Sequence, residues 1–114
     1  MKRILIIEDN NSRINQFKEN FTNAELTIVK TVDKAIKTIK KNKQFDYMFF
    51  DHDLGSGGDS ITIVDWLLNH KNKIAPNVYV HSANPVGAQN ILNKIPSARK
   101  AAMIWKKEVN FKKK

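Results

Sequence analysis

Short apolar runs alternate with helical stripes along this chain, and that alternation constrains the fold more than any other feature. Four runs of strand length are rich in β-branched and aromatic residues: Arg3–Ile7, Leu26–Thr31, Asp46–Asp51 and Asn77–His81. Between these runs, apolar residues recur at spacings of three and four, which is the period of a helix with one buried face. Strands and helices that alternate with short connections predict βαβ units around a parallel sheet.

Capping residues mark where the helices are expected to begin. Asn10 or Asn11 can cap the first helix, and Asp59 or Ser60 can cap the third. Pro85 is expected at the first position of the fourth helix, where its missing N–H costs nothing. The expected buried faces are Ile14, Phe17 and Phe21; Val32, Ala35, Ile36 and Ile39; Ile61, Val64, Leu67 and Leu68; and Ala88, Ile91, Leu92 and Ile95.

The length of 114 residues suits one domain, residues 1–114, that ends in a basic tail at about 107–114. Residues 101–105 (AAMIW) fit either a fifth strand or part of a terminal helix from Ser97 onward, and periodicity leaves both open. The absence of cysteine excludes disulfides and thiolate metal sites. The apolar run at the start is too short for a signal peptide or a membrane span, so we expect a cytoplasmic protein without a membrane partner.

Basic residues dominate the charge of the chain. Lysine and arginine total 20 against 11 acidic residues, which gives a formal net charge of +9. This balance favours anionic partners such as nucleic acid or nucleotides. A coding bias toward lysine, asparagine and isoleucine explains the same charge without any partner, and both interpretations stay open.

Polar side chains gather where the expected strands end. In chain order they are Glu8, Asp9, Asp51, His52, Asp53, His81, Ser82 and Lys106. In open parallel sheets, ligands bind at the carboxyl ends of the strands. Several carboxylates at one edge repel one another unless a cation lies among them, and oxygen ligands suit Mg²⁺ or Mn²⁺. Any one of these residues alone is a plausible loop or cap residue, and a histidine in the position of His81 is usually structural. Gly55, Gly57 and Gly58 match no nucleotide-binding fingerprint and are expected to form a flexible loop.

The same residues resemble the receiver domain of two-component signalling. Ile4–Asp9 (ILIIED) is similar to the first strand of receivers with its acidic pair, and Phe49–Asp51 to the third strand, which ends in the aspartate that receivers phosphorylate. Ser82–Ala83 is similar to the Ser/Thr-Ala step after the fourth strand, and Lys106 to the lysine after the fifth. This resemblance covers nearly the whole chain. It implies a flavodoxin-like three-layer α/β/α fold with a five-stranded parallel sheet in the order 2-1-3-4-5.

A narrower family resembles the chain more closely. Receivers do not usually carry histidines at the positions of His52 and His81, and here the last helix is expected to be short or absent. The segments FDHDLG (residues 50–55) and VHSANPVGAQ (residues 80–89), with Arg13 after the acidic pair, resemble the cyclic-phosphate processing receivers. The family name implies processing of cyclic phosphates, such as the 2′,3′-cyclic phosphate ends of cleaved RNA.

Three functions follow as hypotheses. The first is a phosphodiesterase that opens cyclic phosphates of RNA ends or nucleotides by metal-assisted chemistry with histidine as acid and base. It assigns Glu8, Asp9, Asp51 and Asp53 to the metal, Asp51, His52 and His81 to catalysis, and Arg13, Ser82, Asn84 and Lys106 to phosphate binding. Strand parity opposes part of this scheme, because the neighbours His81 and Ser82 should point to opposite faces.

The second hypothesis is a stand-alone receiver that is phosphorylated on Asp51. The third is a module that binds nucleotides or RNA ends without turnover. Histidine separates the first hypothesis from the second, because a phosphorylation switch needs neither His52 nor His81. A missing last helix would leave the sheet face beside the first helix thinly covered, so a homodimer is also expected.

Overall fold

A parallel sheet forms the centre of the fold. The computed structural model describes residues 1–51, 54–81 and 85–100. The strands are β1 (Lys2–Ile7), β2 (Ala24–Val29), β3 (Tyr47–Phe50), β4 (Asn77–Val80) and β5 (Arg99–Lys100). All neighbouring strands are parallel, and their order is β2-β1-β3-β4-β5. The expected flavodoxin-like sheet order is therefore confirmed.

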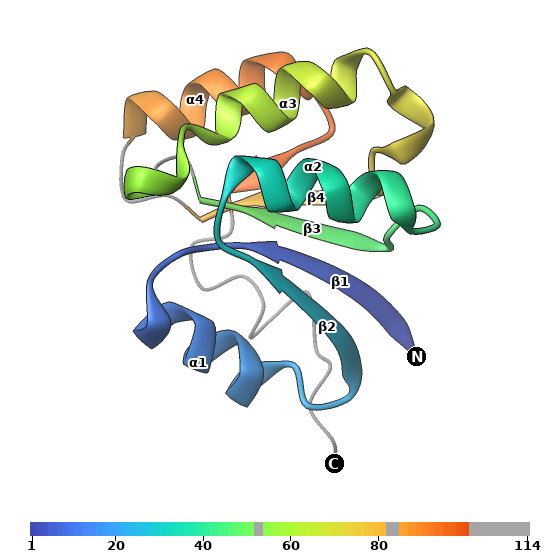
Figure 1. The fold of residues 1–114 in the computed structure, drawn as a ribbon, viewed down its shortest axis with the longest axis vertical. Coiled ribbons are helices and arrows are strands. Elements are labelled where there is room, and N and C mark those ends of the chain that lie inside the picture. Colours follow the sequence, from blue (N-terminus) through green and yellow to red (C-terminus); the bar gives the residue numbers. More distant parts are fainter. Residues whose placement is uncertain (52–53, 82–84, 101–114) are drawn as a thin grey trace.

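Helices cover both faces of this sheet. The helices are α1 (Asn11–Asn20), α2 (Val32–Lys41), α3 (Ser60–Leu68) and α4 (Pro85–Lys94), with short 3₁₀ turns η1 (Gly55–Gly57) and η2 (Lys71–Lys73). Helix α1 lies on one face, whereas α2, α3 and α4 lie together on the other (Figure 1). The three-layer arrangement is confirmed. In the described part of the chain, no helix is both long enough and apolar enough to cross a bilayer.

Side-chain caps set the helix starts. The Asn10 side chain accepts a hydrogen bond from the backbone N–H of Arg13, and Asp59 accepts one from Ile61. The Thr31 side chain caps α2 in the same way. The expected second strand, which extended to residue 31, therefore ended two residues too late. Threonine favours both strands and N-caps, and here the capping preference decides.

Alternating side chains of the central strands pack into two apolar cores, one on each face of the sheet. Leu5 and Ile7 of β1 pack toward α2, α3 and α4, whereas Ile4 and Ile6 pack toward α1. All four are fully buried, which explains why the run is continuously apolar rather than alternating. On the α1 face, Phe17, Phe21, Phe49 and Tyr79 form an aromatic cluster.

The end of the chain differs in part from expectation. Arg99 and Lys100 pair with β4 as a short strand, so a terminal helix does not begin at Ser97. Residues 101–105, the basic tail and the expected short last helix all lie outside the described residues. Within the described ranges, α1 is the only helix on its face of the sheet (Figure 1).

The backbone after β3 requires glycine at three positions. Gly55 and Gly58 have φ angles of 60° and 103°, in the left-handed region that other residues avoid. A Cβ atom on Gly57 would lie 2.6 Å from the backbone oxygen of Lys30. The expected flexible loop is thus a 3₁₀ turn packed against the start of α2.

Candidate functional site

Three polar residues lie side by side at the carboxyl ends of adjacent strands. They are Glu8, Asp51 and His81, and they follow residues that pair across β1, β3 and β4, namely Ile7, Phe50 and Val80. The ladder continues beyond the strands, because Asp51 N–H donates to the oxygen of Ile7 (3.0 Å) and His81 N–H to that of Phe50 (2.9 Å). Since side chains alternate, all three point to the face that α1 covers. Parity therefore places His81 with the carboxylates.

His81 and Glu8 form a buried pair. The Nε2 atom of His81 lies 3.0 Å from Oε1 of Glu8, and the two side chains are 5% and 0% exposed. The imidazole ring also packs edge-on against Phe17 of α1, with 5.1 Å between ring centroids. The second ring nitrogen, Nδ1, is buried and has no hydrogen-bond partner among the described residues.

The start of α1 holds the other oxygen of Glu8. Oε2 accepts hydrogen bonds from the backbone N–H groups of Asp9 and Asn10, each at 3.1 Å. Burial alone raises the pKa of Glu8, but the hydrogen bonds from His81, Asp51 and Asn10 outweigh burial and lower it to about 2. Glu8 is therefore an anion at neutral pH. It follows that the Nε2–H of His81 donates to Glu8, and that Nδ1 carries an unused lone pair.

Asp51 has the opposite electrostatic environment. Its side chain is 7% exposed. Burial raises the pKa of Asp51 to about 7, and the hydrogen bond and negative charge of Glu8 add to this effect. Asp51 thus holds a proton close to neutral pH, while Glu8 beside it is ionised. Two neighbouring carboxyl groups with pKa values driven apart are typical of sites that perform acid–base chemistry.

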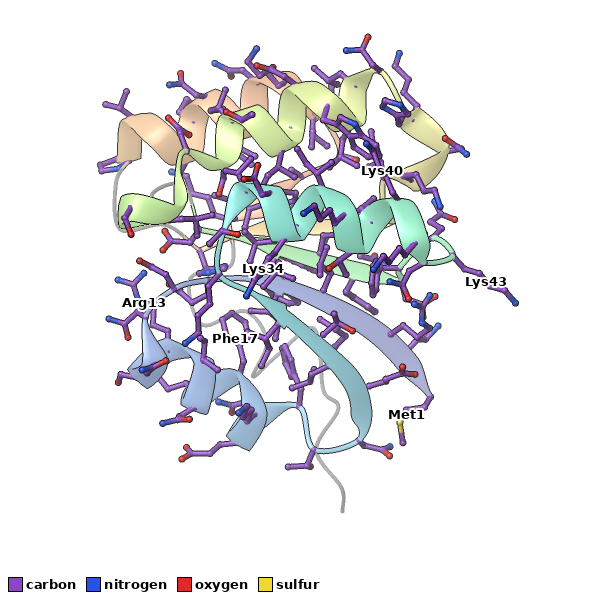
Figure 2. The ribbon with its side chains drawn as sticks, in the orientation of Figure 1. Met1, Arg13, Phe17, Lys34, Lys40 and Lys43 are labelled. Atoms are coloured by element: carbon purple, nitrogen blue, oxygen red, sulfur yellow. The ribbon has the colours of Figure 1, made fainter. Side chains whose placement is uncertain are left out.

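Arg13 contacts both carboxyl groups. Its Nη1 atom lies 3.5 Å from Oε1 of Glu8 and 3.6 Å from Oδ2 of Asp51. The Arg13 side chain is 38% exposed, so its guanidinium group is open to solvent on one side. Figure 2 shows it at the end of α1 that lies beside the strand ends. Arg13 therefore neutralises the carboxyl pair and can also reach an anion in solution.

A divalent cation fits the donor set. Glu8, Asp9 and Asp51 each offer an oxygen atom, and these atoms lie within 4.8 Å of one another. Carboxylate oxygens at this spacing are ligands that Mg²⁺ and Mn²⁺ prefer. The proton held by Asp51 is a second indication, because it relieves the repulsion that a cation would relieve. Arg13 competes for the same carboxylates.

Part of the expected site lies outside the described residues. His52, Asp53, Ser82, Asn84 and Lys106 remain predictions for that reason. The sequence did not indicate that Arg13 contacts Asp51, nor that Phe17 packs on His81. The residue spacing of α1 places Arg13 and Phe17 one helical turn apart on one face, and that spacing was the available signal.

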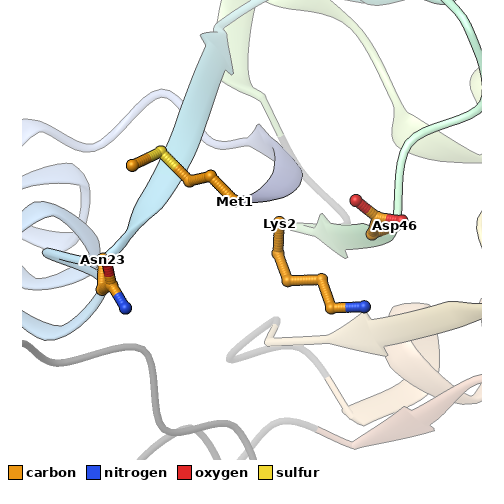
Figure 3. A pocket seen from close by; sticks show the side chains of 4 residues that line it. All are labelled: Met1, Lys2, Asn23 and Asp46. Atoms are coloured by element: carbon orange, nitrogen blue, oxygen red, sulfur yellow. The ribbon is translucent and has the colours of Figure 1, made fainter.

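A separate hollow lies at the opposite edge of the sheet, where the strands begin. Its described lining residues are Met1, Lys2, Asn23 and Asp46 (Figure 3). Of the expected site residues that the structure describes, none lines it. The chemistry is concentrated at the carboxyl ends of the strands.

Comparisons with known proteins agree with this fold. A family model described as "Cyclic-phosphate processing Receiver domain" matches residues 3–97. A comparison with curated protein sequences found no match. Among solved structures, the response regulator TrrA of Thermotoga maritima, in complex with Mg²⁺–BeF, is similar at a TM-score of 0.74 and 15% identity, over 92% of this chain and 90% of that one.

Two further structures are similar at the same level. A response regulator of Burkholderia pseudomallei, solved with a phosphorylated aspartic acid, a calcium ion and citrate, has a TM-score of 0.72 and 16% identity, over 97% of this chain and 62% of that one. The beryllofluoride-activated NtrC4 receiver domain dimer has a TM-score of 0.68 and 20% identity, over 89% and 84%. At these identities the similarity establishes the receiver fold.

Proposed function

Because the chain belongs to the cyclic-phosphate processing receiver family, we propose that it hydrolyses cyclic phosphodiesters at the site of Glu8, Arg13, Asp51 and His81. The observation that carries this proposal is the buried Glu8–His81 pair. A receiver that only accepts a phosphoryl group on Asp51 has no need of a histidine fixed by a carboxylate. The substrate class is the 2′,3′-cyclic phosphate end of RNA or a cyclic nucleotide.

His81 is the proposed general base. Glu8 accepts the Nε2–H and so fixes the tautomer, as a carboxylate does for the histidine of a catalytic triad. Burial lowers the pKa of His81, and Glu8 only partly offsets this, so the ring is neutral and can accept a proton at Nδ1. The proton comes from the water molecule whose oxygen attacks phosphorus, and substrate binding must first open the buried Nδ1 atom to that water.

Asp51 is the proposed general acid, and Arg13 the proposed phosphate ligand. As the new P–O bond forms, the bond from phosphorus to one ring oxygen of the cyclic ester breaks, and that oxygen takes the proton of Asp51. With its pKa raised to about 7, Asp51 is a suitable donor near neutral pH. The guanidinium group of Arg13, partly open to solvent, can pair with the phosphate oxygens on which negative charge builds up.

Glu8, Asp9 and Asp51 would hold a divalent cation, Mg²⁺ or Mn²⁺, in this scheme. Such an ion supplies charge stabilisation to a phosphoryl oxygen. When a cation is bound, Asp51 is ionised and His52 is the remaining candidate for the acid. The proposed phosphate contacts of Ser82, Asn84 and Lys106 and the cation contact of Asp53 complete the scheme.

The test is turnover of a short RNA with a 2′,3′-cyclic phosphate end, with and without a chelator. We expect the cyclic end to be converted to a 2′- or 3′-phosphate, which chromatography detects. The variant His81→Ala is expected to lose this conversion. If activity persists with the chelator, Asp51 is the general acid. If the chelator abolishes activity, the reaction requires a divalent cation. A wild-type rate that survives both His52→Ala and His81→Ala contradicts the mechanism. Substrate that binds but is recovered unchanged identifies a binding module.

Phosphorylation of Asp51 is the second candidate function. Asp51 directly follows β3 and lies beside Glu8 and Asp9. The similar Burkholderia pseudomallei regulator carries a phosphorylated aspartic acid with a calcium ion. Acetyl phosphate with Mg²⁺ would then add a phosphoryl group to the wild type but not to Asp51→Asn, as intact mass would show. A homodimer also remains a prediction, in line with the NtrC4 receiver domain dimer, and a monomeric mass by light scattering would remove it.

A further inference from the structure

Exposed lysines gather at the end of the molecule that is remote from Glu8 and Asp51. They come from the second half of α2, the turn after it, and η2: Lys37, Lys40, Lys41, Lys43 and Lys71. Both α2 and α3 end at the edge of the sheet where the strands begin, so this lysine platform lies opposite the acidic site (Figure 2). None of the five lysines forms an ion pair with a described residue.

Long-range hydrogen bonds hold the platform in one shape. The guanidinium group of Arg3 donates to the backbone oxygen of Lys43 (3.1 Å) and to the side-chain oxygen of Asn42 (3.0 Å). The amine of Lys73 in η2 donates to the backbone oxygen of Asn42 (2.6 Å). These bonds tie the turn after α2 to β1 and η2. The lysines are therefore presented by a fixed surface, which lowers the entropy cost of binding.

Two flat rings border the lysines. The exposed His70 ring stacks on Trp66, with 3.9 Å between the ring centroids and 11° between the planes. The Nδ1 atom of His70 is held 2.8 Å from the backbone oxygen of Trp66. The amine of Lys40 lies 5.9 Å from the centroid of the Trp66 ring. This arrangement provides a flat aromatic surface with positive charge beside it.

We propose that the lysine platform binds single-stranded nucleic acid, with phosphates on the lysines and a base stacked on His70. Proteins that bind single strands without sequence preference combine cations along the backbone with aromatic rings that stack on bases. An acidic protein would use the lysines but gains nothing from the ring stack. This inference does not depend on the proposed hydrolysis, because the platform and the acidic site lie at opposite ends of the strands.

Charge reversal tests the phosphate contacts. Fluorescence anisotropy with a labelled single-stranded RNA of about 12 nucleotides gives the affinity. The variant Lys37→Glu/Lys40→Glu/Lys41→Glu is expected to bind at least about ten-fold more weakly, with a salt dependence reduced by roughly two ions. The matched control, Lys18→Glu/Lys30→Glu/Lys100→Glu, changes exposed lysines elsewhere and has the same net charge. It is expected to keep most of the affinity.

Further measurements complete the test. If the charge-reversed triple unfolds, Lys37→Gln/Lys40→Gln/Lys41→Gln replaces it and should weaken binding in the same direction. His70→Ala is expected to weaken binding of the RNA several-fold but to leave binding of an abasic strand of equal length unchanged. Absence of binding by the wild type, equal weakening in the control triple, or equal competition by polyglutamate would overturn the proposal.

Discussion

Asp51→Asn is expected to raise the melting temperature of the metal-free protein above that of the wild type at alkaline pH, by a margin that shrinks as the pH falls. The pKa of Asp51 is raised from 3.8 to about 7 in the folded state. The folded protein therefore keeps a proton that the unfolded chain has already lost. The stability contributed by Asp51 is fully present below its unfolded pKa and is lost as the pH rises through about 7.

Glu8 contributes in the opposite direction and in a different pH range. Its pKa is lowered from 4.5 to about 2, so its contribution is present above pH 4.5 and is lost as the pH falls through about 2. His81 acts against Asp51 in the neighbouring range, because burial lowers its pKa from 6.5, so its contribution is fully present above pH 6.5 and is lost as the pH falls. The contribution of Asp51 is therefore measured as the difference in melting temperature between Asp51→Asn and the wild type, which should grow from about pH 5 to about pH 8. An asparagine at position 51 has nearly the same shape as aspartic acid and stays neutral at every pH.

Thermal melts in chelator measure this effect directly. At about pH 8, Asp51→Asn is expected to melt roughly 5 °C or more above the wild type, and the two should converge toward about pH 5. Glu25→Gln, which removes an exposed carboxylate from β2, is the matched control and should follow the wild type. A difference between Asp51→Asn and the wild type that stays constant over this range would mean that Asp51 is ionised in the folded protein.

The sequence predicted the strands of a parallel sheet well, because each central strand is an apolar run that only a doubly covered sheet accommodates. The order of the strands came from the resemblance to receiver domains. The sequence also predicted that Glu8, Asp9 and Asp51 meet at one edge. It predicted the end of β2 wrongly, because Thr31 is a β-branched residue that suits a strand but caps α2 here. The start of β5 at Arg99 was also missed, because two exposed basic residues, Arg99 and Lys100, carry no strand pattern.

The direction of His81 illustrates a second kind of limit. Sequence parity said only that His81 and Ser82 point to opposite faces, and not which one faces the carboxylates. The register Phe50↔Val80 decides it, since it places His81 directly beside Asp51. Register depends on how two strands distant in sequence align, and periodicity within one strand does not contain that information. The contact from Arg13 to Asp51 likewise joins residues distant in sequence, here by the packing of α1 on the sheet.

Arg13 is the residue whose loss should change the site most, because it faces two carboxyl groups at once. Its positive charge lies 3.5–3.6 Å from Glu8 and Asp51, where a divalent cation would also be held. Arg13→Gln is expected to bind Mn²⁺ about ten-fold more tightly, because the competing charge is gone. Paramagnetic titration of free Mn²⁺ measures this affinity.

The same variant should lose hydrolysis of the cyclic phosphate by at least about 100-fold, because a phosphate ligand is removed from the transition state. Arg13→Lys keeps the charge without the two-pronged geometry, and it should keep the weak Mn²⁺ affinity while recovering only part of the rate. Lys18→Gln, on an exposed position of the same helix, is the matched control and should leave both quantities unchanged. Unchanged Mn²⁺ affinity in Arg13→Gln would show that the cation does not bind at Glu8 and Asp51. An unchanged rate would show that Arg13 does not contact the phosphate.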